Sequence, residues 1–326
     1  MLYRLLPLSL MALLFSAARP ALAGSGYNSD VRPILSENCF ACHGPDSASR
    51  KAGLRLDQPG WNSKTFLSRV MSGTMPPASS HKTLTAAQKA TLKAWIASGA
   101  KYEKHWSFQS PSAASMGGID SFIQARLKKE KLDFSPEAGR EEWLRRVTLD
   151  LTGLPPTIPE IDTFLADSAP GAQERVVDKL LASPHFGEQM AIPWLDLARY
   201  GDSYGYHSDQ LETVWPWRDW VVSAFNQNLP YDKFITYQLA GDLVPNATKE
   251  TRLATAFNRL HRMTNEGGSV AEEWRLEAVA DRVKTFGTAF LGLTLECARC
   301  HDHKFDPIKQ SDFYKLSAFF NSIDEY

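Results

Sequence analysis

The residues best suited to chemistry are four cysteines that occur as two pairs, each followed directly by a histidine. The chain reads C-F-A-C-H at 39–43 and C-A-R-C-H at 297–301. Two thiols at this spacing can add to the two vinyl groups of a haem, and the adjacent imidazole can bind the iron. The sequence therefore predicts two covalently bound c-type haems, held by Cys39, Cys42 and His43 and by Cys297, Cys300 and His301.

Other uses of paired cysteines fit the pattern less well. Two disulfides or a redox dithiol would not require a histidine after each pair. A zinc ribbon brings its two cysteine pairs within roughly 15 to 20 residues, whereas these pairs lie near opposite ends of the chain. Covalent haem attachment is thus the interpretation that uses every residue of both motifs.

The first motif is followed by residues that could complete its iron. Met75 lies in a Met-Pro-Pro sequence, and a thioether on a loop stiffened by proline could reach the open axial position. Met71 and His81 are the alternatives. A capping box at Thr85, an apolar helical face and a glycine stop predict a closing helix just before residue 100. Residues 24–102 therefore resemble a small cytochrome c domain.

The second iron has a clear candidate on one side only. His301 is the proximal ligand of choice, and His303 is too near in sequence to reach the opposite face, so it is expected to support the site or lie at the surface. An open iron remains an alternative to a distal side chain. Glu266 could act as an acid or base above an open iron, or simply cap a helix or pair with a cation. The candidate distal ligands are His185, His207, His261 and Met263.

The elements that position these residues are predicted to be helical. Apolar residues recur with helical period at 119–127 and at 176–181, and Thr157 with Glu160 forms another capping box. Residues 103–118 are rich in Ser, Ala and Gly and read as a linker. We therefore expect a mainly α protein, with a helical domain over 119–326 carrying the second motif.

The first 23 residues predict export. Arg4 precedes an apolar run that is followed by an Ala-Leu-Ala cleavage site at 21–23, which is typical of a secretory signal peptide. The apolar run is shorter than the roughly 20 residues that span a bilayer. We expect a mature protein that begins near Gly24, has no transmembrane span and resides in the periplasm or its equivalent.

Composition excludes one class of partner. The 36 Lys and Arg residues are balanced by 37 Asp and Glu residues, giving a net charge of -1. A protein that binds nucleic acid neutralises phosphates with an excess of positive charge. Nucleic acid is therefore not an expected partner.

Several longer strings resemble the planctomycete-type cytochrome c family. They are LDLTGLPP at 149–156, WLDLARY at 194–200, WPWRDW at 215–220, NEGG at 265–268 and CARCHDHKFDPI at 297–308. The resemblance implies an N-terminal cytochrome c domain joined to a helical DUF1549 domain. Members typically continue into a DUF1553 domain, which this sequence lacks, so the resemblance implies a short or truncated member.

These patterns lead to one leading function and two alternatives. The leading hypothesis is an exported di-haem cytochrome that exchanges electrons with a redox protein or a quinone-linked chain. The first alternative is an oxidoreductase resembling a di-haem peroxidase, with an open second haem. The second is a polysaccharide-binding module with a redox relay. The polar residues Asp196, Arg199, Asp202, Arg218 and Asp219 could form a cleft with tryptophan platforms for a sugar or a docking partner. A buried network of ion pairs around core tryptophans is the simpler interpretation.

Overall fold

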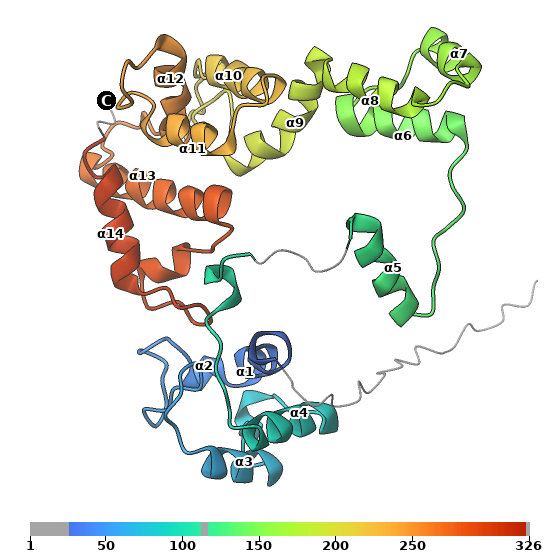
Figure 1. The fold of residues 1–326 in the computed structure, drawn as a ribbon. Coiled ribbons are helices and arrows are strands. Elements are labelled where there is room, and N and C mark those ends of the chain that lie inside the picture. Colours follow the sequence, from blue (N-terminus) through green and yellow to red (C-terminus); the bar gives the residue numbers. More distant parts are fainter. Residues whose placement is uncertain (1–25, 112–116, 324–326) are drawn as a thin grey trace, which may run out of the picture. The chain divides into compact units, whose positions relative to one another are not determined.

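The computed structural model describes residues 26–111 and 117–323 (Figure 1). The predicted signal peptide lies outside these residues. Within the described ranges the regular secondary structure is helical, apart from an isolated antiparallel β-bridge between Ser203 and Leu211. The predicted mainly α fold is confirmed. No helix in the described ranges combines the length and hydrophobicity needed to cross a membrane.

The chain divides into two compact units. Of the described residues, the first unit contains 26–111 and 301–309, and the second contains 117–300 and 310–323. Short 3-10 or π segments are labelled η. The helical segments of the first unit are η1 (Tyr27–Val31), α1 (Arg32–Asn38), α2 (Phe40–His43), α3 (Ser63–Met71), η2 (Ala78–Ser80), α4 (Ala86–Ala97) and η3 (Trp106–Phe108).

Helix α4 shows why the first unit folds as the sequence predicts. Thr85 and Gln88 form a reciprocal capping box at its start, and Gly99 adopts a φ of 100° just after its end. Leu92 and Trp95 on its inner face are almost fully buried. They belong to a core drawn from most helices of the unit: Tyr27, Val31, Ile34, Leu35, Phe40, Leu56, Phe66, Val70, Leu84, Leu92 and Trp95.

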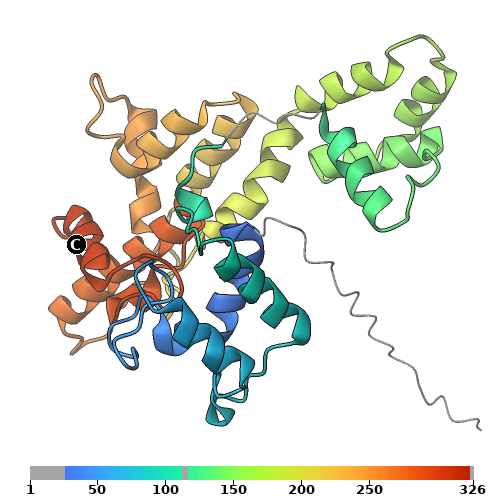
Figure 2. The same ribbon diagram turned by 60° about the horizontal axis from the view of Figure 1, so that its bottom comes forward.

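The second unit is a series of packed helix groups. Helices α6 (Arg140–Thr152), α7 (Ile158–Ala166) and α8 (Ala172–Leu181) lie side by side in both views (Figures 1 and 2). Helix α9 (Pro184–Leu197) packs on both α6 and α10 (Trp215–Asn226). Its segments are α5 (Ile119–Lys129), α6 (Arg140–Thr152), α7 (Ile158–Ala166), α8 (Ala172–Leu181), α9 (Pro184–Leu197), α10 (Trp215–Asn226), α11 (Tyr231–Ala240), α12 (Lys249–Ala254), η4 (Thr255–Arg259), α13 (Ala271–Phe286), η5 (Gly287–Leu291), η6 (Glu296–Arg299) and α14 (Gln310–Phe320).

The structure differs from the predicted domain boundaries at two places. The predicted linker begins at Glu103, but the Glu103 carboxylate accepts backbone N–H groups from Tyr27 and Asn28 at 3.0 and 3.3 Å, which ties it to the first unit. Residues 301–309 also belong to the first unit rather than to the helical domain. Sequence order alone could not show either contact, because both join segments distant in the chain.

Helix α5 forms where periodicity predicts it, but its apolar face is not covered. Ile119, Phe122 and Ile123 are 81%, 46% and 47% exposed. Periodicity therefore predicted the helix correctly, while burial of that face does not occur among the described residues.

Trp217 is the central side chain of the second unit's core. It is fully buried, and its indole N–H donates to the Ala254 carbonyl at 3.1 Å. Trp217→Ala is expected to lower the free energy of unfolding by about 3 to 5 kcal/mol, because it leaves a large cavity and an unpaired carbonyl. Trp215→Ala, on the same helix but 50% exposed, should cost less than about 1 kcal/mol. Equal losses in urea unfolding would contradict this assignment.

Candidate haem sites

The first motif opens onto a cavity large enough for a cofactor. Cys39, Cys42, His43 and Met75 all line a cavity of about 530 Å³, within the range of roughly 300 to 1,000 Å³ seen for ligand sites. A haem needs an apolar pocket with a few polar groups near the iron, and the remaining wall fits that need. Its apolar lining includes Ala41, Leu54, Leu56, Trp61, Phe66, Val70, Pro76 and Pro77.

A single helical turn holds the three groups of the first motif. The N–H groups of Cys42 and His43 donate to the Cys39 carbonyl at 3.0 and 2.8 Å. Phe40, between the cysteines, is 1% exposed and anchors the turn in the core. The backbone thus fixes both thiols and the imidazole relative to the cavity.

The His43 ring is oriented by one hydrogen bond. Its Nδ1 lies 3.2 Å from the Lys51 carbonyl oxygen, and a carbonyl can only accept, so Nδ1 carries the proton. Burial lowers the pKa of His43, and the bond to Lys51 only partly opposes this effect. The ring is therefore neutral at pH 7 with a free lone pair on Nε2, the form that binds iron.

The Cys39 thiol does not have the properties of a redox dithiol. Burial raises its pKa to about 12, whereas reactive dithiols depend on a lowered thiol pKa. All four cysteines are free of disulfides. In the described part of the chain, no group of three or more His, Cys, Asp or Glu side chains is arranged to hold a metal ion. Burial therefore distinguishes Cys39 from the reactive thiol of a redox dithiol.

Of the three candidates for the distal position at the first iron, Met75 is the one that lines the cavity. Met71 is 50% exposed and His81 is exposed, and neither contributes to the wall. The loop that carries Met75 folds back on α3, because Thr74 and Met75 both donate their N–H groups to the Arg69 carbonyl, at 3.0 and 3.2 Å. Met75 is thereby placed in the same cavity as His43.

The second motif shares the histidine geometry of the first. The His301 Nδ1 lies 2.8 Å from the Asp302 carbonyl oxygen, so this ring also carries its proton on Nδ1. The lone pair on Nε2 is then available to bind iron. Cys297 lies in η6, and both Cys297 and Cys300 are exposed. These two cysteines belong to the second unit and His301 to the first. The residue types fit a covalent haem.

The predicted distal candidates for the second iron differ in availability. His261 is 8% exposed and uses both ring nitrogens: Nδ1 donates to the Arg262 carbonyl at 3.0 Å, and Nε2 accepts from Arg282 at 2.9 Å. Because Nε2 is occupied, His261 is a core residue rather than a free ligand. His185 is exposed, with Nδ1 2.7 Å from Glu188. Met263 is half-buried.

Glu266 lies at the surface beside another candidate. Its carboxylate is 52% exposed and approaches the His207 Nε2 at 3.9 Å. The sequence singled out both residues without predicting their proximity. This exposed pair does not form the dry environment in which a glutamate becomes a general acid.

His303 corrects one expectation. It was predicted to support the site or lie at the surface, and it is 7% exposed. Its Nδ1 accepts the backbone N–H of Asp306 at 2.9 Å, so that nitrogen is unprotonated, and its 3.5 Å approach to the Asp306 carboxylate is not an ion pair. Of the two expected locations, the surface is excluded because the ring closes the 303–306 turn from inside.

The polar residues around the tryptophans form separate pairs. Arg199 contacts Asp281 at 2.5 Å, and Arg218 contacts its neighbour Asp219 at 2.8 Å near the surface. Trp217 is a core residue. The core position of Trp217 agrees with the simpler interpretation, but the predicted single buried network is replaced by separate pairs, one of them exposed.

Sequence reasoning missed the groups that orient the two histidines. The Lys51 and Asp302 acceptors are backbone carbonyls, and any residue type can supply a carbonyl. A side-chain pattern therefore contains no signal for them. Only the fold of each loop determines where these oxygens lie.

Two families match the chain, in the order that the sequence predicts. Residues 28–96 match the family described as cytochrome C oxidase, cbb3-type, subunit III, which supports a cytochrome c domain with covalently bound c-type haem. Residues 118–325 match the family described as Protein of unknown function (DUF1549). No curated protein and no solved structure matches the chain. The predicted architecture is confirmed, and the chain belongs to the DUF1549 family, with a cytochrome c domain at its N-terminal side.

Proposed function

We propose that this chain is an exported di-haem c-type cytochrome that transfers electrons. The observation that carries the proposal is shared by the two motifs. In each one the histidine donates its Nδ1 proton to a backbone carbonyl, from Lys51 or from Asp302, and has no partner on Nε2 among the described residues. An imidazole held in this way is prepared to bind iron.

Each residue at the first site would have a separate role in binding the haem. Cys39 and Cys42 would hold the haem covalently, and His43 and Met75 would bind its iron. The bound haem supplies an iron that accepts and returns one electron. A thioether favours the reduced iron, so Met75 would raise the reduction potential. The apolar side chains that line the cavity exclude water. An environment without water favours the oxidation state of the haem that has the lower net charge.

At the second site Cys297 and Cys300 would hold the haem and His301 would bind its iron. The redox partner would be a protein or a quinone-linked chain, reached after export through the N-terminal signal peptide. Export is tested by the mass of the secreted protein, which should begin near Gly24.

The decisive measurement is the haem content of the purified protein. Two covalently bound haems per chain are expected from intact mass and from haem staining of denaturing gels. Both haems should be reduced and reoxidised reversibly. A mass with one haem, or with disulfides in place of haem, would contradict the proposal.

A second function, a haem-dependent oxidoreductase resembling a di-haem peroxidase, is favoured by one observation. The predicted distal candidate His261 is already bound through Nε2 to Arg282, so this side chain does not close the second iron. Consumption of peroxide by the fully loaded protein would support the enzyme, and its absence would favour electron transfer alone.

A further inference from the structure

The segment that follows the second motif, residues 301–309, is a compact loop. The His303 N–H donates to the Ile308 carbonyl at 2.7 Å, and the Ile308 N–H donates to the Asp306 carbonyl at 2.8 Å. The Asp306 N–H donates to the His303 ring at 2.9 Å. These bonds give the loop one conformation, with His301 at its start.

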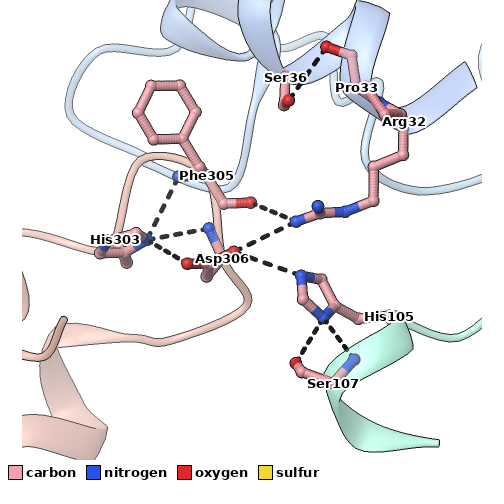
Figure 3. Close-up of polar contacts among 8 residues, drawn as sticks. All are labelled: Arg32, Pro33, Ser36, His105, Ser107, His303, Phe305 and Asp306. Atoms are coloured by element: carbon pink, nitrogen blue, oxygen red, sulfur yellow. Dashed lines mark hydrogen bonds and ion pairs between the residues drawn. The ribbon is translucent and has the colours of Figure 1, made fainter. Parts of the chain in front are cut away.

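The Asp306 carboxylate attaches this loop to other segments of the first unit (Figure 3). Its Oδ1 accepts from the Arg32 guanidinium at 3.2 Å and lies 3.3 Å from the His105 Nε2. Arg32 also donates to the Phe305 carbonyl at 3.2 Å. Arg32 begins α1, the helix that leads into Cys39. One side chain therefore links the loop to the helix before the first haem motif.

The hydrogen-bond directions at His105 are mutually consistent. Ser107 donates its N–H to the His105 Nδ1 at 3.3 Å, so the ring carries its proton on Nε2, facing Asp306. Burial and the Arg32 charge lower the pKa of His105, which keeps the ring neutral. The side chains of Arg32 and His105 are 15% and 13% exposed. The Asp306 side chain is 32% exposed, so both contacts are partly shielded from water, which strengthens charge-assisted hydrogen bonds.

A second contact brings the loop to the residue that follows His43. A Cβ added at Gly44 would lie 3.0 Å from the Lys304 carbonyl oxygen, so the two backbones pack directly. The loop that carries His301 therefore packs against the turn that leaves the first motif.

We propose that Asp306 is a positioning residue for the second haem: through Arg32 and His105 it holds the loop that carries His301 on the first unit, beside the first haem motif. The inference rests on the proposed function, because it takes His301 as the second axial ligand. It adds that the two axial histidines belong to the same compact unit. Because Asp306 lies in the loop of His301, whereas the Lys51 carbonyl orients His43, a change at Asp306 should act on the second haem.

The test is Asp306→Ala in the holoprotein, with Asp306→Asn as a milder variant. Hydrogen exchange of a peptide covering 301–309 should become about tenfold faster in Asp306→Ala, because charged hydrogen bonds that fix the loop are lost. The reduction potential of the second haem should shift, while that of the first stays unchanged. Asp219→Asn removes a carboxylate paired with Arg218 elsewhere and should leave both readouts at wild-type values.

A double-mutant cycle separates this role from a general loss of stability. Because Asp306 and Arg32 share one contact, Arg32→Ala combined with Asp306→Ala should change exchange and potential by less than the sum of the two single variants. Unchanged potentials in Asp306→Ala, with or without faster exchange, would overturn the positioning role in a protein that carries two haems. A wild-type chain with one haem would instead overturn the proposed function.

Discussion

Replacing Met75 with alanine should abolish the charge-transfer band between thioether sulfur and iron and lower the potential of the first haem. Met75 lines the cavity that also contains His43. Loss of a soft ligand that favours the reduced iron destabilises that oxidation state. Axial ligands set haem potentials over a range of about 0.8 V, so we expect a drop on the order of 0.1 V. Absorption spectra and a redox titration measure both effects.

Met71 provides the matched control for this experiment. It lies four positions earlier at the end of α3, is 50% exposed and does not line the cavity. Met71→Ala should leave the band and the potential unchanged. Retention of the band in Met75→Ala, together with its loss in Met71→Ala, would move the assignment to Met71. Haem content should remain the same in both variants, because neither removes a thiol.

The first site was predictable because its signals are local. The C-x-x-C-H turn needs only five consecutive residues, and the capping box at Thr85 fixes the start of α4 through bonds between residues three apart. The position of Met75 required the fold, but its neighbourhood narrowed the choice to three side chains. The spacing of the C-x-x-C-H motif and other short-range patterns therefore indicated the residues in this cavity that would bind the haem.

Contacts between distant segments could not be predicted in the same way. Asp306 pairs with Arg32, and nothing in either residue's local sequence indicates the other. The burial of His303 follows from the turn it closes, and the exposed face of α5 shows that periodicity predicts a helix without identifying what covers it. A single sequence gives the period of an element, whereas its partners depend on the packing of the whole chain.

The second haem should be the one that binds external ligands. Met75 would block the first iron, whereas His261, a buried candidate for the second, already uses Nε2 to accept from Arg282. Carbon monoxide should therefore bind the reduced protein quickly at about one site per two haems, since a closed six-coordinate iron must first lose a ligand. Flash photolysis or rapid mixing measures this fast phase.

Changing Cys297 and Cys300 to alanine should halve the haem content and eliminate the fast phase. Both thiols are exposed, and their removal leaves the core of the first unit untouched. The converse change, Cys39→Ala with Cys42→Ala, should also leave one haem but retain the fast phase. If both haems of the wild type resist carbon monoxide, the second iron is six-coordinate. Met263→Ala is then the first variant to make, because its thioether, unlike the His261 ring, is not already committed to Arg282.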